Sequence, residues 1–71
     1  MEKRSFTLSG HQTSVALEPD FWAVLEAVAE AREISMAALV EMVDAKRESS
    51  NLASALRCHA LNEALNAEPL D

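Results

Sequence analysis

The sequence is poor in the residues that build covalent or metal-bound sites. Its 71 residues include one cysteine, two histidines, one glycine, two prolines and no tyrosine. A single cysteine excludes an intrachain disulfide, and together with two histidines it supplies no ligand set for a structural zinc ion. We therefore expect neither a metal nor a cofactor.

Long apolar runs are also absent. No run approaches the roughly 18 residues that are needed to span a bilayer, and residues 1–17 lack the apolar core of a signal peptide. These absences predict a cytoplasmic protein with no membrane partner. The chain is long enough for one domain, 1–71, and a domain this small buries only about 60% of the surface of its unfolded chain. A partner subunit would add to such a core.

The sequence contains no recognisable catalytic constellation. It has no nucleophile beside a base, no glycine-rich phosphate loop, and no carboxylate pair that stands out from the general acidity. Cys58 and His59 fall in a helical pattern, where a small apolar residue and a surface or interface histidine are the simplest interpretations. We expect no catalytic residues and no enzyme activity.

Charge is distributed unevenly along the chain. The net charge is −6, but residues 1–17 hold one acid, Glu2, and two bases, Lys3 and Arg4. The remaining chain carries the other eleven acids and four bases. Because negative charge opposes approach to a phosphate backbone, any nucleic-acid surface is expected in the N-terminal segment.

That N-terminal segment, about residues 4–17, is predicted to be extended. It is rich in Ser, Thr and apolar residues and has no helical period. Phe6 and Leu8 occupy even positions, whereas Val15 and Leu17 occupy odd ones. One face holds all four only if the chain shifts register between them, and Ser9-Gly10 predicts a bulge, turn or bend there.

Three helices are predicted after the extended segment. Pro19 between two acids is typical of a first helical turn, Ser35 is placed to cap a second helix, and Asn51 is placed to cap a third. Apolar residues recur at helical spacing after each start. The helices are expected at about 19–32, 35–47 and 52–65.

One strand segment followed by helices leaves backbone groups unpaired. Arg4–Leu8 can fold back on Gln12–Leu17, although a two-stranded hairpin alone is marginally stable. The simpler expectation is antiparallel pairing with the same segment of a second chain across a two-fold axis.

The order of these features resembles a known family. The run 14–22, SVALEPDFW, followed by Leu25, Val28-Ala29 and the run 34–40, ISMAALV, is similar to the strand, helix start and helix turn of ribbon-helix-helix proteins. The whole of 4–65 resembles a bacterial subgroup of short stand-alone members with an added C-terminal helix. The resemblance implies a mostly helical homodimer with an N-terminal β-ribbon, plus a third helix.

The resemblance also implies a function, which is transcription regulation by binding double-stranded DNA. The outward strand residues Gln12, Ser14 and Ala16 would contact base edges, although the family typically has a basic or polar residue where Ala16 stands. Further contacts, to phosphate or from a flexible N-terminal arm, are expected from Lys3, Arg4, His11, Ser35 and Met36. Glu33 stands where glycine is common in the family.

The predicted dimer core consists of apolar residues from the strand and the first two helices. They are Val15, Leu17, Phe21, Trp22, Leu25, Leu39 and Val43. An alternative function is a dimeric interaction module that uses its acidic face or its third helix to bind a partner protein.

Overall fold

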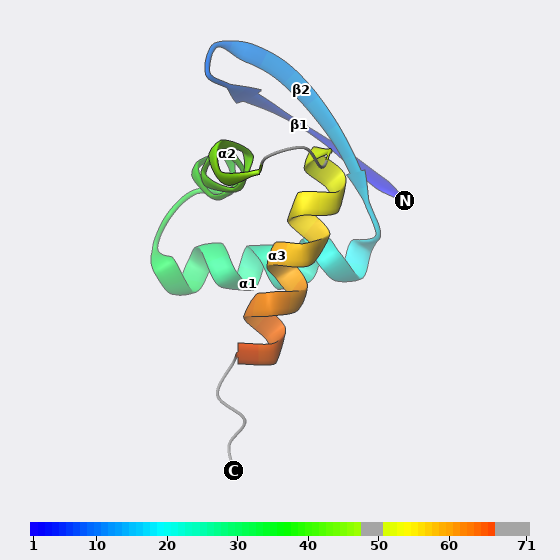
Figure 1. Cartoon of the computed structure of the whole chain (residues 1–71), viewed down its shortest axis with the longest axis vertical. Coiled ribbons are helices and arrows are strands. Elements are labelled where there is room, and N and C mark those ends of the chain that lie inside the picture. Colours follow the sequence, from blue (N-terminus) through cyan, green and yellow to red (C-terminus); the bar gives the residue numbers. More distant parts are fainter. Residues whose placement is uncertain (48–50, 67–71) are drawn as a thin grey trace.

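The computed structural model describes residues 1–47 and 51–66. A two-stranded ribbon lies on one side of three helices, and the first and third helices cross beneath it (Figure 1). In chain order the elements are β1 (Glu2–Leu8), β2 (His11–Leu17), α1 (Pro19–Arg32), α2 (Met36–Lys46) and α3 (Leu52–Asn66). The fold is therefore mostly helical with an N-terminal β-ribbon, as the sequence predicts, and each helix begins and ends within about a residue of its expected bounds.

The ribbon is a hairpin closed by the two residues Ser9 and Gly10. Both have positive φ angles, 52° and 81°, as in the type I′ turn whose twist suits a two-residue hairpin. The strands are antiparallel, with Arg4 opposite Val15 and Phe6 opposite Thr13. The turn thus resolves the register shift, because it brings the apolar residues of both strands to the same face.

The strand partner differs from the simpler expectation. β2 pairs along its whole length with β1 of the same chain, and residues 2 and 3, outside the predicted extended segment, belong to β1. The hairpin is more than marginal here because its apolar face is covered by helices, and Leu8, Val15 and Leu17 are all buried. Pairing with a second chain stays a prediction, and it would use the other edge of β2.

The helix ends are fixed by local hydrogen bonds. Ser35 Oγ accepts from the Ala38 amide at 3.0 Å, and Asn51 Oδ1 accepts from the Ser54 amide at 2.7 Å, so both act as N-caps. Glu33 ends α1 in the left-handed conformation, with φ of 59°. The amide of Ile34 donates to the Ala29 carbonyl at 3.0 Å, which completes a Schellman motif.

One apolar core joins the ribbon to all three helices. Six of the seven residues expected in a dimer core are buried within the single chain, and Phe21 is partly buried against them. α3 adds Leu52, Leu56 and Ala60, so the third helix is part of the core. The buried residues are Leu8, Val15, Leu17, Trp22, Leu25, Ala29, Leu39, Val40, Val43, Leu52, Leu56 and Ala60.

Candidate nucleic-acid interface

The side of the ribbon that faces away from the helices carries six small or polar residues, which we call the outer face. Because side chains alternate along a strand, the register puts Lys3 opposite Ala16, Ser5 opposite Ser14 and Thr7 opposite Gln12 on this side. The Ser5 and Ser14 hydroxyl oxygens lie 3.0 Å apart. The outer face includes the three expected base-contact residues, Gln12, Ser14 and Ala16, and it has no acidic side chain.

Two outer-face residues, Ser5 and Thr7, were not predicted as site residues. Their alternation with Phe6 and Leu8 indicates an outward direction. That alternation places them beside β2 only if the chain turns back at Ser9-Gly10. The pairing of β1 with β2 therefore raises the number of polar side chains on this side of the ribbon from two to five.

Arg4 has a different position from the one expected. It lies on the opposite side of β1, where its Nε is 2.8 Å from Glu2 Oε2 and its Nη1 is 2.6 Å from Glu26 Oε2. The guanidinium lies 4.8 Å from the centre of the Trp22 ring. The hydrogen bonds to Glu2 and then Glu26 raise the pKa of Arg4 above its ordinary value.

The expectation of a flexible N-terminal arm is wrong, because residues 2–8 form strand β1. The Trp22 indole N–H donates to the Glu2 carbonyl oxygen at 2.8 Å, so α1 holds the first residues of β1 in place. Lys3 therefore projects from an ordered strand. The Arg4 guanidinium already contacts two carboxylates and an aromatic ring, so Arg4 does not belong to the outer face.

Most cations of the chain are already paired. Arg32 contacts Glu63 at 2.7 Å, Arg47 contacts Asp44 at 2.6 Å, and Arg57 contacts Glu18 at 3.0 Å. The Arg57 guanidinium holds the pKa of the Glu18 carboxyl below its ordinary value. Among residues 1–47 and 51–66, Lys3 and Lys46 form no ion pair, and of these two only Lys3 lies on the ribbon.

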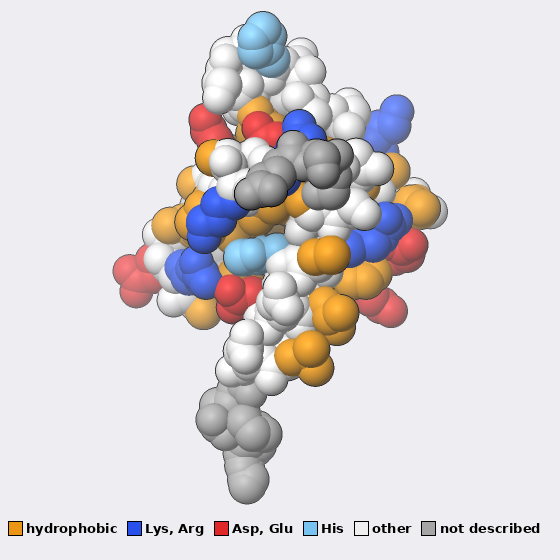
Figure 2. Space-filling model, viewed as in Figure 1, with side chains coloured by type: hydrophobic (Ala, Val, Ile, Leu, Met, Phe, Trp, Pro, Cys, Tyr) orange, Lys and Arg blue, Asp and Glu red, His pale blue; other side chains and the backbone are white. Residues whose placement is uncertain are grey.

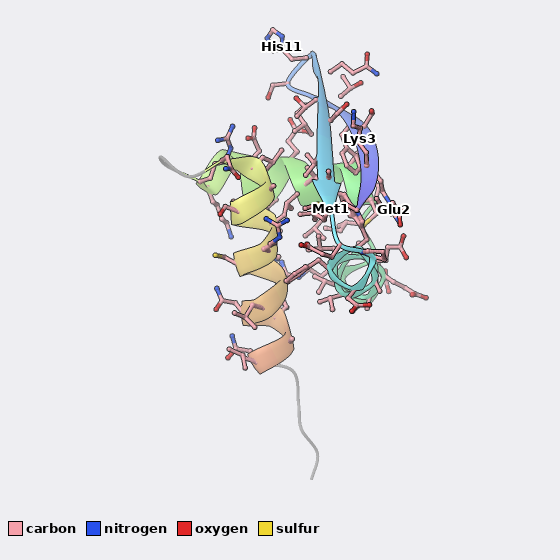
Figure 3. The ribbon with its side chains drawn as sticks, turned by 90° about the vertical axis from the view of Figure 1, so that its right-hand side faces the viewer. Met1, Glu2, Lys3 and His11 are labelled. Carbon is pink, nitrogen blue, oxygen red and sulfur yellow. The ribbon has the colours of Figure 1, made fainter. Side chains whose placement is uncertain are left out.

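The remaining expected phosphate contacts are not gathered on the outer face. His11 is exposed at the tip of the ribbon, with Met1, Glu2 and Lys3 towards the other end (Figure 3). Ser35 and Met36 belong to the start of α2, where the first amides have no acceptor within the helix. The Ser35 hydroxyl oxygen already accepts the capping hydrogen bond.

Acidic side chains are concentrated on the helices. In the view of Figure 2 they lie around the helical body, whereas the projecting end of the ribbon carries mostly uncharged atoms and His11. The outer face, which has no acidic side chain, is therefore less negative than the helical body, as the uneven charge of the sequence indicates.

A family model described as "Ribbon-helix-helix domain" matches residues 1–64, and the chain belongs to this family. Its members are generally DNA-binding transcription regulators rather than enzymes, and they typically form dimers. No curated protein and no solved structure matches the chain. In the part of the chain that the structure describes, no helix has the length and apolar character to cross a membrane, and no three potential metal ligands cluster.

His59 lies between α2 and α3, away from the outer face. Its Nε2 is buried without a hydrogen-bond partner, and the nearest carboxylate oxygen, Glu63 Oε2, is 3.6 Å away. Burial lowers the pKa of His59 below its ordinary value, and it outweighs the opposing effect of Glu63. Arg32 and Lys46 lower it further, so the imidazole is neutral near pH 7.

This pKa predicts a loss of stability in mild acid. Below about pH 6.5, the ordinary histidine pKa, the unfolded chain binds a proton at His59 more readily than the folded chain, so the free energy of unfolding falls as pH falls. His59→Leu removes this contribution. The free energy of unfolding, measured by urea denaturation, should then change less between pH 7 and pH 5. His11→Gln, at an exposed position, is the control. Equal pH dependence in wild type and His59→Leu would contradict the assignment.

Proposed function

We propose that this chain is a dimeric, sequence-specific DNA-binding transcription regulator that inserts β2 of each subunit into the major groove. The observation that carries the proposal is the outer face, which has five polar side chains, one alanine and no acid, on the side of the ribbon away from an acidic body. The two β2 strands, one from each subunit, would form a two-stranded ribbon, and the major groove, which is about 12 Å wide, admits such a ribbon.

The two strands differ in their ability to pair with a second chain. β1 carries three successive charged residues, Glu2, Lys3 and Arg4, and such charges disfavour pairing of its free edge with a further strand. β2 contains no Asp, Glu, Lys or Arg. Its unpaired edge is therefore the one that supports antiparallel pairing with β2 of a partner subunit, and such an isologous pair would read a two-fold symmetric site.

The outward residues of β2 have the chemistry for base recognition. The Gln12 amide can donate to and accept from adenine, the Ser14 hydroxyl can bond to several bases, and the Ala16 methyl suits the methyl group of thymine. These contacts distinguish bases only in combination, since a serine and an alanine carry little information alone.

The acidic body does not prevent this mode of binding. Arg4 offsets one of the two charges of Glu2 and Glu26, and Arg57 offsets that of Glu18, so part of the negative charge nearest the ribbon is balanced. Among residues 1–47 and 51–66, most of the other acids belong to the helical body (Figure 2), and one of them, Glu41 of α2, accepts a hydrogen bond from the Ser9 hydroxyl at 3.4 Å at the hairpin turn. At physiological salt the Debye length is about 8 Å, which weakens their repulsion of DNA on the far side.

The direct test is selection of sites by the purified protein from a random double-stranded DNA library at about 0.1 M salt, where phosphate contacts still contribute strongly. We expect an enriched sequence with two-fold symmetry, and a dimer by light scattering. No enrichment from a protein shown to be a folded dimer would contradict the proposal. In that outcome, the alternative of an acidic protein-interaction module would take its place.

Replacing Gln12 tests the reading residue itself. Gln12→Ala should weaken binding to the selected site by about 1–3 kcal/mol for each lost base contact, and repeat selection should show a relaxed preference at one position of each half-site. Thr13→Ala is the matched control, because Thr13 is the next residue of β2 and faces the helices. If Gln12→Ala binds the selected site as tightly as wild type does, the contact assignment is wrong.

A further inference from the structure

We infer that β1 is a phosphate-binding strand. In the DNA complex proposed above, on which this inference rests, the outward side chains of β1 contact the sugar-phosphate backbone at the edge of the major groove. Lys3 supplies the charge, and the hydroxyls of Ser5 and Thr7 supply hydrogen bonds. β2 reads the bases, so the two strands of each hairpin have different tasks.

The first argument is one of width. Pairing of β2 with a second β2 gives a four-stranded sheet, in which β1 of each subunit is an outer strand. Neighbouring strands lie about 4.8 Å apart, so the outer strands are separated by about 14 Å. The major groove is about 12 Å wide. The central pair therefore enters the groove, and the outer strands lie against its walls, where the phosphates are.

The chemistry of the outward residues of β1 agrees with this position. Phosphate contacts come chiefly from Lys and Arg, from hydroxyl side chains and from backbone amides. Lys3, Ser5 and Thr7 belong to these types, whereas β2 supplies the amide of Gln12. Lys3 is also the ribbon cation that forms no ion pair among the described residues, because Arg4 is held by Glu2 and Glu26.

The third argument is that β1 is held rigidly. The Trp22 indole fixes the Glu2 carbonyl, and Arg4 connects the strand to Glu26 of α1. These contacts flank Lys3 on both sides in sequence, so its backbone is fixed before DNA binds. Ordering that is already present in the free protein does not oppose binding. The lysine therefore acts as an outward contact on a strand positioned by the core.

Salt dependence separates phosphate contacts from base contacts. Each phosphate contact contributes about −0.9 to the slope of log K against log salt concentration. With one Lys3 contact from each subunit, the slope of Lys3→Gln should be shallower by about 2. Between 50 and 200 mM salt, this variant should lose about 10-fold less affinity than wild type does. Its loss of affinity at low salt should be similar for the selected site and for scrambled DNA.

Two further variants make the result specific. Lys46→Gln removes a second cation that forms no described ion pair but lies in α2, and its slope should match that of wild type. Gln12→Ala should keep the wild-type slope and show a reduced preference for the selected site over scrambled DNA. Thr7→Ala should weaken binding to the selected site and to scrambled DNA to the same extent.

Each contrary outcome has a definite meaning. If Lys3→Gln alters the preferred sequence while the slope stays constant, β1 reads bases and our inference is wrong, although the proposed DNA binding stands. If Lys46→Gln reduces the slope as much as Lys3→Gln does, the effect is one of overall charge and the inference is also wrong. If the wild-type protein binds no DNA, the proposed function itself fails.

Discussion

Trp22→Ala is expected to destabilise the chain by about 3–5 kcal/mol, the usual loss when a buried aromatic side chain is truncated. Trp22 is 1% exposed and is among the largest buried residues. A chain of this length typically has a free energy of unfolding of about 4–11 kcal/mol. The substitution therefore removes a large part of the stability, and urea denaturation followed by circular dichroism should show it.

Trp22 also has a role that its size alone does not explain. Its ring lies 6.0 Å from that of Phe6 and 4.8 Å from the Arg4 guanidinium, and its N–H binds the Glu2 carbonyl. Trp22→Phe keeps much of the buried ring and removes the hydrogen bond. We expect a smaller loss, about 1–3 kcal/mol, with faster hydrogen exchange of the β1 amides. A loss below about 1 kcal/mol for Trp22→Ala would contradict the packing described here.

The helices could be predicted because their signals are local. Pro19 lies in a first helical turn, and Ser35 and Asn51 form capping hydrogen bonds within three residues of themselves. Such short-range contacts do not depend on the rest of the fold. The left-handed conformation of Glu33 is a local feature too. Glycine, which is common at this position in the family, adopts this conformation without strain.

The pairing of the strand could not be decided from the sequence. A hairpin and a pair of strands across a two-fold axis both provide hydrogen-bond partners for the backbone N–H and C=O groups, and both are compatible with alternating apolar residues. The choice depends on whether helices cover the apolar face of the hairpin, and that is a property of the whole fold. The position of Arg4 follows from the same choice, because the hairpin register sends its side chain towards Trp22 and Glu26.

The outer face was therefore predicted in part. The outward direction of Gln12, Ser14 and Ala16 follows from burial of Val15 and Leu17, which the sequence indicates by itself. The contribution of β1 needs the second strand in place. Charge counts alone place Lys3 and Arg4 together, whereas the alternation of the strand separates them, with one lysine outward and one arginine inward.

Gln12→Glu is expected to reduce affinity for the selected DNA more than Gln12→Ala does. The substitution keeps the size of the side chain, removes its N–H donors and adds a negative charge that would face the groove in the proposed complex. Loss of the base contact in both subunits corresponds to about 2–6 kcal/mol, and charge repulsion adds to it. We expect at least about a 100-fold weaker equilibrium binding of the labelled site at about 0.1 M salt.

The control must add the same charge elsewhere. Asn62→Asp has the same change of charge and size on an exposed position of α3, away from the ribbon, and it should bind DNA within about 2-fold of wild type because screening limits its reach. Ala16→Arg makes the opposite change at the other end of β2 and should tighten binding. If Asn62→Asp weakens binding as strongly as Gln12→Glu does, overall charge rather than the outer face governs the interaction. If Gln12→Glu has no effect, β2 does not enter the groove.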